Sequence, residues 1–237
     1  MIWRLIDAFR GGTGVDIALV LTQLAATAIV LIFCLPVHEL AHAWAAKKLG
    51  DDTAAMHGRL TLNPARHLDI FGTLMILTVG FGYAKPVPVN PRNFKNRRKG
   101  MALTAAAGPL SNLIMAVAFC LLYFILLYVV AFAAAARGES SIDFNSPGGL
   151  VLAFVYVLFL RNVGLMVFNL IPFPPLDGSR IMDLLLPAKW SYSYAKYEPL
   201  LRWGVFALLL FSGPLSWLIE KTADGIYFVV GLPFRLI

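Results

Sequence analysis

Residues 38 to 42, His-Glu-Leu-Ala-His, place two metal-binding side chains and a carboxylate within a long apolar run. In a helix, His38 and His42 are four residues apart and project from one face, whereas Glu39 lies about 100° away from His38, beside the pair. Two neutral imidazoles suit Zn²⁺, and a neighbouring carboxylate can take a proton from a water activated by the metal. This spacing is typical of zinc-dependent hydrolytic sites on helices.

The same five residues allow other interpretations. In a soluble helix the pattern arises readily by chance, and the three side chains could then be merely solvated. Within a membrane span that explanation is weaker, because intramembrane ionisable residues are rare and usually functional. A proton relay or the metal site of a transporter would use the same residue types.

The composition places the motif in a membrane protein. Of the 237 residues, 59% are hydrophobic and only 14% are charged. A helix needs about 20 apolar residues to cross a bilayer, and four stretches are long enough: 15–49, 101–136, 148–176 and 199–219. The shorter stretch 70–83 predicts a re-entrant or interfacial element. We expect an all-α polytopic membrane protein, one domain over residues 1–237, with about four transmembrane helices and one short re-entrant or β-like element.

The basic residues lie between the apolar stretches, as membrane topology requires. The connectors 47–100 and 177–198 hold 10 and 3 Lys/Arg, whereas the opposite side of a four-span protein would hold five. The positive-inside rule places both connectors in the cytoplasm and both termini outside. The net charge of +7 therefore indicates a lipid bilayer as the partner and no nucleic acid.

Four further residues have simpler expected roles. Cys34 and Cys120 lie in separate apolar runs and predict packing residues, because two cysteines make no disulfide framework. His67 could bind a second metal, but a local hydrogen bond is the favoured role. Arg161, inside an apolar run, is expected to pair with a backbone carbonyl or to extend toward the membrane surface.

A third metal ligand must come from elsewhere in the chain. Position 48, where one class of zinc enzymes has a histidine, is lysine, and no glutamate occurs between Glu39 and Glu139. The aspartates of the polar connector lie at the wrong depth if that connector stays outside the bilayer. Asp177 remains, in FNLIPFPPLDGSR, where prolines forbid a continuous helix and Gly178 allows a tight turn.

A broken span can direct this carboxylate at a metal. Irregular backbone at membrane depth is tolerated only where it is buried in protein or lines a cavity. The alternative is a helix that is simply ended by prolines at the interface.

These motifs resemble the site-2 protease family of intramembrane zinc metalloproteases. HELAH (38–42), followed far downstream by NLIPFPPLDG (169–178), is similar to the family's paired motifs. NPARHLDIFGT (63–73), GYAKPVPVNP (82–91) and AGPLSN (107–112) resemble the compact subgroup without PDZ or CBS domains. The resemblance extends over roughly residues 30–185.

The resemblance implies an endopeptidase that cuts transmembrane segments of membrane-protein substrates with one Zn²⁺ per chain. His38, His42 and Asp177 correspond to the zinc ligands and Glu39 to the general base. Asn169 matches the asparagine that holds the substrate or stabilises the oxyanion; by itself it could equally cap the helix break. We expect a multi-pass protein of a prokaryotic inner or plasma membrane, with the site toward the cytoplasm and the oligomeric state open.

Two other classes of function use the same residues. A metal or proton transporter would predict related repeats in the two halves of the chain, but HELAH and PPLDG do not resemble each other. A metal-dependent chaperone or scaffold would bind transmembrane helices without cutting them, and a cleavage assay separates it from a protease.

Residues 82–91 predict one more element. Pro86 and Pro88 suit an extended edge strand, which could hold a substrate by strand addition. The alternative is a loop that only packs against the core.

Overall fold

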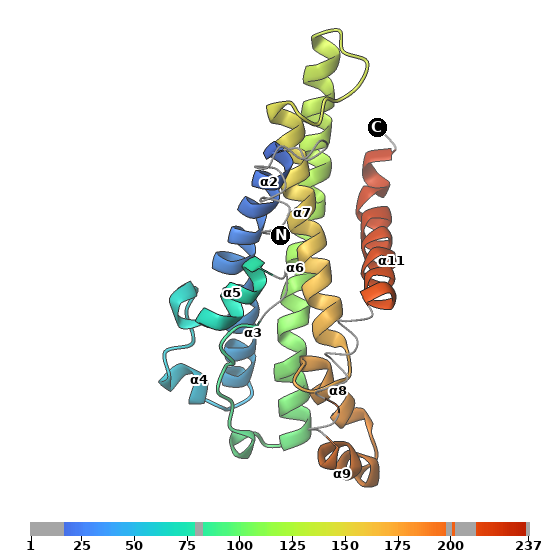
Figure 1. The fold of residues 1–237 in the computed structure, drawn as a ribbon. Helices are drawn as coiled ribbons and strands as arrows, with labels where there is room; N and C mark the ends of the chain where they lie inside the picture. Colours follow the sequence, from blue (N-terminus) through green and yellow to red (C-terminus); the bar gives the residue numbers. More distant parts are fainter. Residues whose placement is uncertain (1–16, 79–82, 198–200, 202–211, 236–237) are drawn as a thin grey trace.

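The computed structural model describes residues 17–78, 83–197, 201 and 212–235. This part of the chain is built almost wholly of helices (Figure 1). Three of its helical segments are long and apolar enough to cross a membrane: Ile17–Lys48, Arg97–Ala136 and Pro147–Leu170. The expected class, an all-α polytopic membrane protein, is confirmed.

The first span is one continuous helical rod with a local change of pitch. It comprises α2 (Ile17–Ile29), the π-helical turn η1 (Val30–Cys34) and α3 (Leu35–Lys48). Pro36 is the second residue after the π-helical turn and cannot donate a backbone N–H, so the wider turn accommodates it without ending the helix. The HELAH motif follows within α3.

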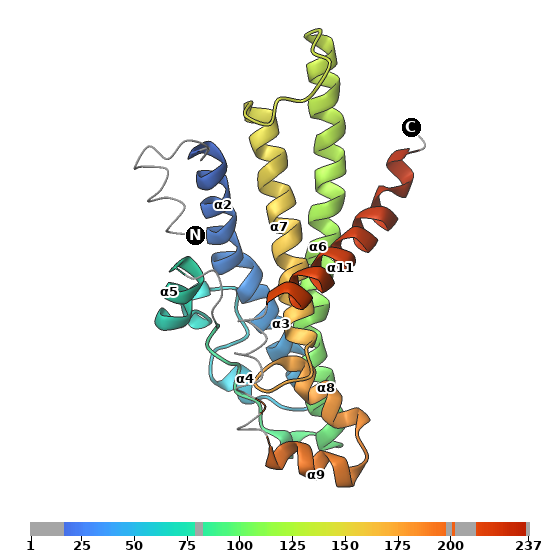
Figure 2. The same ribbon diagram turned by 45° about the vertical axis from the view of Figure 1, so that its right-hand side comes forward.

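Helices α6 (Arg97–Ala136) and α7 (Pro147–Leu170) run side by side through the molecule. Figures 1 and 2 show α2 on one side of this pair and α11 (Ser212–Gly231) on the other. Polar side chains cap both central helices: Asn96 accepts from the backbone N–H of Lys99, and Ser146 from that of Gly149. These two helices provide the frame on which the other elements pack.

Two apolar clusters hold the frame together. One joins α6, α7 and α11 and includes Phe124 and Phe159, and the other joins the first span to α6 and α7 around Leu158. Cys34 and Cys120 form no disulfide and are fully buried in these clusters, as the packing prediction requires. Arg161 is exposed on α7, without a hydrogen bond to another described residue.

The fourth expected span, 199–219, lies mostly outside the described residues. Helix α11 begins within that stretch at Ser212 and continues to Gly231. It carries Glu220, Lys221 and Asp224, so its described part is more polar than the three spans.

The connector between α3 and α6 contains α4 (Thr53–Met56), η2 (Pro64–Arg66), α5 (Ile70–Thr78) and η3 (Pro91–Asn93). The short apolar stretch expected at 70–83 is therefore helical at its start. Ile70 and Phe71 are 84% and 73% exposed, which fits an element that contacts lipid. The β-like part is reduced, within the described residues, to an isolated antiparallel bridge between Leu68 and Ala84.

A buried carboxylate organises this connector. Asp51 is fully buried, and its side chain accepts hydrogen bonds from the backbone N–H of Asn90 and the amide of Asn93, both at 2.7 Å, and from Thr53. Burial by itself raises the pKa of this carboxyl, but the hydrogen bonds from Thr53, Asn90 and Asn93 outweigh it and hold the pKa below its usual value. Asp51 thus ties the start of the connector to its end.

Replacing Asp51 should loosen the connector. Asp51→Ala removes the acceptor of the partly buried backbone N–H of Asn90 and of the Asn93 side-chain amide. Each lost hydrogen bond costs about 0.5–1.5 kcal/mol. Limited proteolysis of detergent-purified protein should show faster cleavage within residues 85–96. The control is Asp52→Ala, because Asp52 is exposed and its side chain does not cap α4. Equal cleavage of both variants would contradict this role.

Candidate metal centre

Three side chains that could hold a metal ion converge where α3, α6 and α8 (Asp177–Leu185) meet. The Nε2 atoms of His38 and His42 lie 3.0 Å apart, and each is 3.3 Å from Oδ2 of Asp177. Both histidines are buried. The structure therefore brings together the three residues that the sequence analysis selected as ligands.

The break after α7 places Asp177. Prolines at 172, 174 and 175 cannot continue a helix, so α7 ends at Leu170 and α8 begins at Asp177. A Cβ atom on Gly178 would lie 2.2 Å from the carbonyl oxygen of Leu170 and 2.5 Å from that of Ile171. The sequence predicted that Gly178 allows a tight turn, but its φ is not positive. Its role is instead to let the two backbone segments approach each other closely.

One face of α6 supports both histidines. Thr104, Gly108 and Asn112 follow each other at intervals of four residues and so lie on the same side of the helix. The carbonyl oxygen of Thr104 is 2.8 Å from Nδ1 of His42, and the side-chain amide of Asn112 is 3.0 Å from Nδ1 of His38. Thus each imidazole has one nitrogen toward α6 and the other toward Asp177.

Gly108 permits the contact between α6 and the imidazoles. A Cβ atom there would lie 2.4 Å from Nε2 of His42 and 2.5 Å from Cε1 of His38. Gly108 and Thr104 are parts of the site that were not predicted from the sequence. A glycine and an asparagine four residues apart inside an apolar span were the available signal, since neither improves an ordinary lipid-facing helix.

The hydrogen bonds determine what the centre can bind. Because a carbonyl only accepts, Nδ1 of His42 carries a proton, and in the neutral imidazole its Nε2 then presents a lone pair. This lone pair faces Oδ2 of Asp177, which is buried without a hydrogen-bond partner. Electron-pair donors that converge in this way require a cation or a shared proton between them.

The distances fit zinc. Ligands about 2.0–2.1 Å from a tetrahedral Zn²⁺ are separated from one another by about 3.3–3.4 Å. The three observed separations are 3.0, 3.3 and 3.3 Å. Two imidazoles and one carboxylate also leave a fourth position open, as in catalytic zinc sites.

The two predicted catalytic residues lie outside this cluster of ligand atoms. Glu39 is buried on α3 next to His38. Asn169 lies one residue before the end of α7, partly buried, and its amide donates to the carbonyl oxygen of Leu165 in its own helix at 2.9 Å. That bond uses one of the two N–H groups of the amide. The catalytic roles of Glu39 and Asn169 stay predictions.

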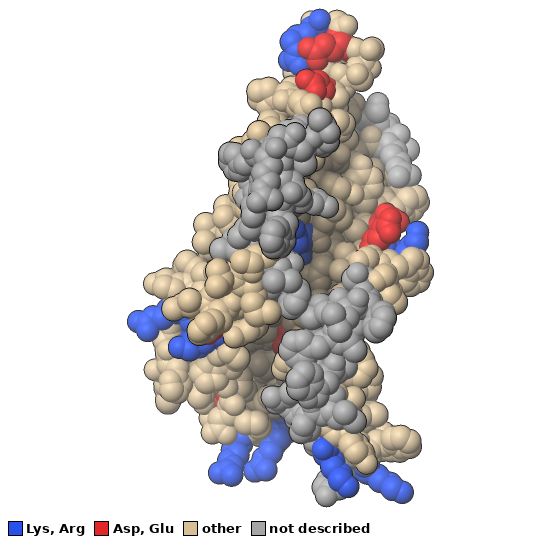
Figure 3. All heavy atoms as spheres, in the orientation of Figure 1, with Lys and Arg blue, Asp and Glu red and all other residues tan. Residues whose placement is uncertain are grey.

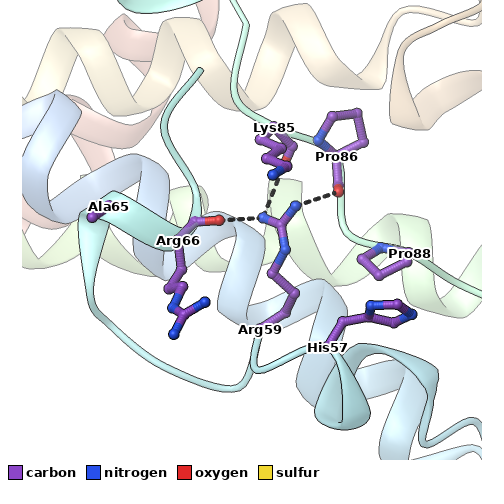
Figure 4. Close-up of a pocket in the computed structure, with 7 residues that line it drawn as sticks. All are labelled: His57, Arg59, Ala65, Arg66, Lys85, Pro86 and Pro88. Carbon is purple, nitrogen blue, oxygen red and sulfur yellow. Dashed lines mark hydrogen bonds between the residues drawn. The ribbon is translucent and has the colours of Figure 1, made fainter. Parts of the chain in front are cut away.

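A buried arginine fixes the extended part of the connector (Figure 4). The guanidinium of Arg59 donates to the carbonyl oxygens of Arg66, Lys85 and Pro86. It lies at a pocket of about 290 Å³ that is also lined by His57. The N–H of Lys85 donates to the carbonyl of His67 at 2.7 Å. Residues 84–90 are thus fixed by Arg59 at one end and by Asp51, through Asn90, at the other.

His67 has the local role that was favoured for it. It is fully buried, and its Nε2 donates to the carbonyl oxygen of Thr61 at 2.7 Å. It belongs to no group of three or more metal-ligating residues in the described part of the chain.

The sequence matches known proteins of one family. Residues 26–212 match the profile of Peptidase family M50. "Putative zinc metalloprotease YwhC" of Bacillus subtilis (strain 168) is 46% identical over 160 residues, which are 67% of this chain and 68% of that protein. "Putative zinc metalloprotease Rip2" of Mycolicibacterium smegmatis (strain ATCC 700084 / mc(2)155) is 28% identical over 197 residues, which are 80% of this chain and 68% of that protein. No solved structure matches significantly.

The space at Gly108 can be tested by adding one methyl group. Gly108→Ala should displace the imidazoles and lower the zinc content of the purified protein, with at least about a tenfold loss of zinc affinity if a ligand is misplaced. Metal analysis by plasma mass spectrometry and chelator competition measure both. Gly225→Ala is the matched control, because a Cβ on this helical glycine meets nothing within 4 Å. Wild-type zinc affinity in Gly108→Ala would refute the close contact.

Proposed function

Since this chain belongs to Peptidase family M50 and is a membrane-embedded zinc metalloprotease, we propose that it is an intramembrane endopeptidase. Its substrates are membrane proteins, cut in or near a transmembrane segment. The observation that carries this proposal is the place of the three converging ligand atoms. They lie between α3, α6 and α8, and α3 and α6 belong to helical segments that are long and apolar enough to cross a bilayer. The family also favours a protease over the transporter considered above.

In this proposal His38, His42 and Asp177 hold one zinc ion per chain. Zinc at such a site polarises the scissile carbonyl and lowers the pKa of a water molecule. Glu39 accepts the proton of the attacking water and later delivers it to the leaving amine, as a general base and then a general acid. Its position beside His38 and its burial away from bulk water support this role.

Asn169 has the remaining catalytic role in this proposal. A tetrahedral oxyanion is stabilised by donors that are already in position before the reaction. The hydrogen bond from Asn169 to Leu165 restrains its amide and leaves one N–H for a substrate carbonyl. This bond is the support for a substrate-holding or oxyanion-stabilising Asn169.

The extended stretch 84–90 is proposed to hold the substrate backbone. In an extended strand the N–H groups of residues 85, 87 and 89 point to the same side. That of Lys85 is bonded to His67, whereas those of Val87 and Val89 donate to no other described residue. An unwound substrate segment could continue the ladder there. Holding the substrate in an extended form would expose its peptide bonds to attack, since the amides of an intact helix are shielded by their own hydrogen bonds.

The charge distribution supports a site that opens to the cytoplasm. Figure 3 shows Lys and Arg gathered at the end of the molecule where α3 ends and α9 (Ala188–Lys196) lies, whereas the opposite tip carries both signs. His42 is six residues before Lys48, or about 9 Å along the helix. By the positive-inside rule this end faces the cytoplasm, in a multi-pass protein of a cell membrane.

Two substitutions separate the general base from the ligands. Glu39→Gln keeps the size and polarity of the side chain but cannot accept a proton. Detergent-purified protein should then retain about one zinc and lose nearly all cleavage. Asp177→Ala removes a charged ligand, so zinc and cleavage should fall together.

Both variants require metal analysis and a cleavage assay on the same folded samples. Membrane proteins captured by the Glu39→Gln variant provide the substrates, which wild-type protein should cut. Cleavage at the wild-type rate by Glu39→Gln would refute the role of Glu39 as the general base. Full zinc content and normal cleavage in Asp177→Ala would place the third ligand elsewhere.

The proposed substrate edge has its own test. Val87→Pro or Val89→Pro removes an N–H from the ladder and is compatible with extended backbone. Cleavage should fall about 5–150-fold, at the roughly 1–3 kcal/mol expected for lost backbone bonds, while zinc stays bound. Val89→Thr, which keeps the N–H and the β-branched shape, should cleave normally. Full activity in both proline variants would leave residues 84–90 with a packing role only.

A further inference from the structure

We propose that Asn112 is a positioning residue whose side-chain oxygen holds His38 in the tautomer that presents Nε2 to zinc; this inference rests on the proposed zinc site. Asn112 lies on α6 and is fully buried. Its amide nitrogen is 3.0 Å from Nδ1 of His38, while its oxygen Oδ1 has no hydrogen-bond partner. A buried amide with one polar atom unsatisfied costs about 1–3 kcal/mol, so this side chain needs an explanation beyond packing.

The chemistry of imidazole fixes the required orientation. A neutral histidine carries one proton, and a nitrogen that binds a metal cannot hold it. For Nε2 of His38 to bind zinc, Nδ1 must carry the proton and donate it to an acceptor. An amide nitrogen cannot accept, so a half-turn of the Asn112 amide must bring Oδ1 to Nδ1.

That half-turn exchanges the positions of the amide oxygen and the amide nitrogen. It gives Oδ1 the hydrogen bond that it lacks in the present orientation. The opposite orientation, in which the amide nitrogen donates to Nδ1, places the proton of His38 on Nε2. This proton would point among His42 and Asp177, where it competes with a metal ion.

The second histidine supplies the comparison. Nδ1 of His42 is held by the carbonyl oxygen of Thr104, which belongs to the backbone and cannot be removed by substitution. Such outer contacts orient metal-binding histidines and raise their basicity. Asn112 orients His38 with a side-chain atom. Of the two contacts from α6 to the histidines, this is therefore the one that a substitution can remove.

Zinc affinity of substituted proteins tests the proposal. Asn112→Leu has a similar size but no acceptor, and zinc affinity should fall about 10–100-fold. In Asn112→Asp, the ionised carboxylate accepts hydrogen bonds but donates none. This variant should therefore bind zinc at least as tightly as wild type. Competition with a fluorescent zinc chelator in detergent gives both affinities without any substrate. The absorption of Co²⁺-substituted protein then reports whether the ligand geometry is kept.

A second buried asparagine provides the control. Asn162 on α7 is fully buried in a span, and its amide donates to Leu158 and Cys34 instead of to a histidine. Asn162→Leu should change zinc affinity less than about twofold even if it lowers the stability of the fold. This separates loss of a hydrogen bond to His38 from general damage to the bundle.

Each result decides the matter. Wild-type affinity in Asn112→Leu would refute the inference, and so would a loss in Asn112→Asp as large as in Asn112→Leu, since a donor would then be required. If Asn112→Leu does not fold, the affinity of Asn112→Asp decides alone. Absence of zinc binding by the wild-type protein would overturn the zinc site itself. Zinc binding with an unaffected Asn112→Leu variant overturns only the role of Asn112.

Discussion

A polar group buried among membrane-spanning helices must find most of its partners inside the protein, because lipid supplies none and bulk water does not surround it. This constraint governs the whole centre. Nε2 of His38 and of His42 turn toward Asp177, and their Nδ1 atoms turn toward α6. Every ring nitrogen is thereby committed, which fixes the rings more firmly than apolar packing would. The helix that carries the motif and the helix that supports it are therefore one functional unit.

Close approach of backbones is what makes these contacts possible. Gly108 brings α6 against the two imidazoles, and Gly178 brings the start of α8 against the end of α7. At either position even a methyl group would overlap atoms that belong to the centre or to the backbone behind it. Small residues serve membrane helices generally in this way. Here they determine the distance between a carboxylate and two imidazoles that come from distant parts of the chain.

The sequence predicted those parts of the site that have a periodic or chemical signature. HELAH has helical spacing, and Asp177 is a carboxylate in a proline-rich break, so both could be selected before the fold was known. Gly108 and the Thr104 carbonyl could not, because their contribution is space and a backbone atom. The three described spans followed from apolar length. The expected edge strand appears as an extended stretch with a bridge at Leu68, since its hydrogen bonds go to side chains more than to another strand.

The connector solves the burial problem in a different way from the metal centre. Asp51 and Arg59 are both buried, yet neither is neutralised by an opposite charge from another described residue. The guanidinium donates to backbone carbonyls, and the carboxylate accepts from the backbone N–H groups of Thr53 and Asn90 as well as from the side chains of Thr53 and Asn93. An ion pair between Asp51 and Arg59 would neutralise both charges, but it would leave the backbone of residues 84–90 without the hydrogen bonds that fix it. Bonding to that backbone instead fixes both ends of the stretch and leaves the N–H groups of Val87 and Val89 available, which is the arrangement that a receiving edge requires.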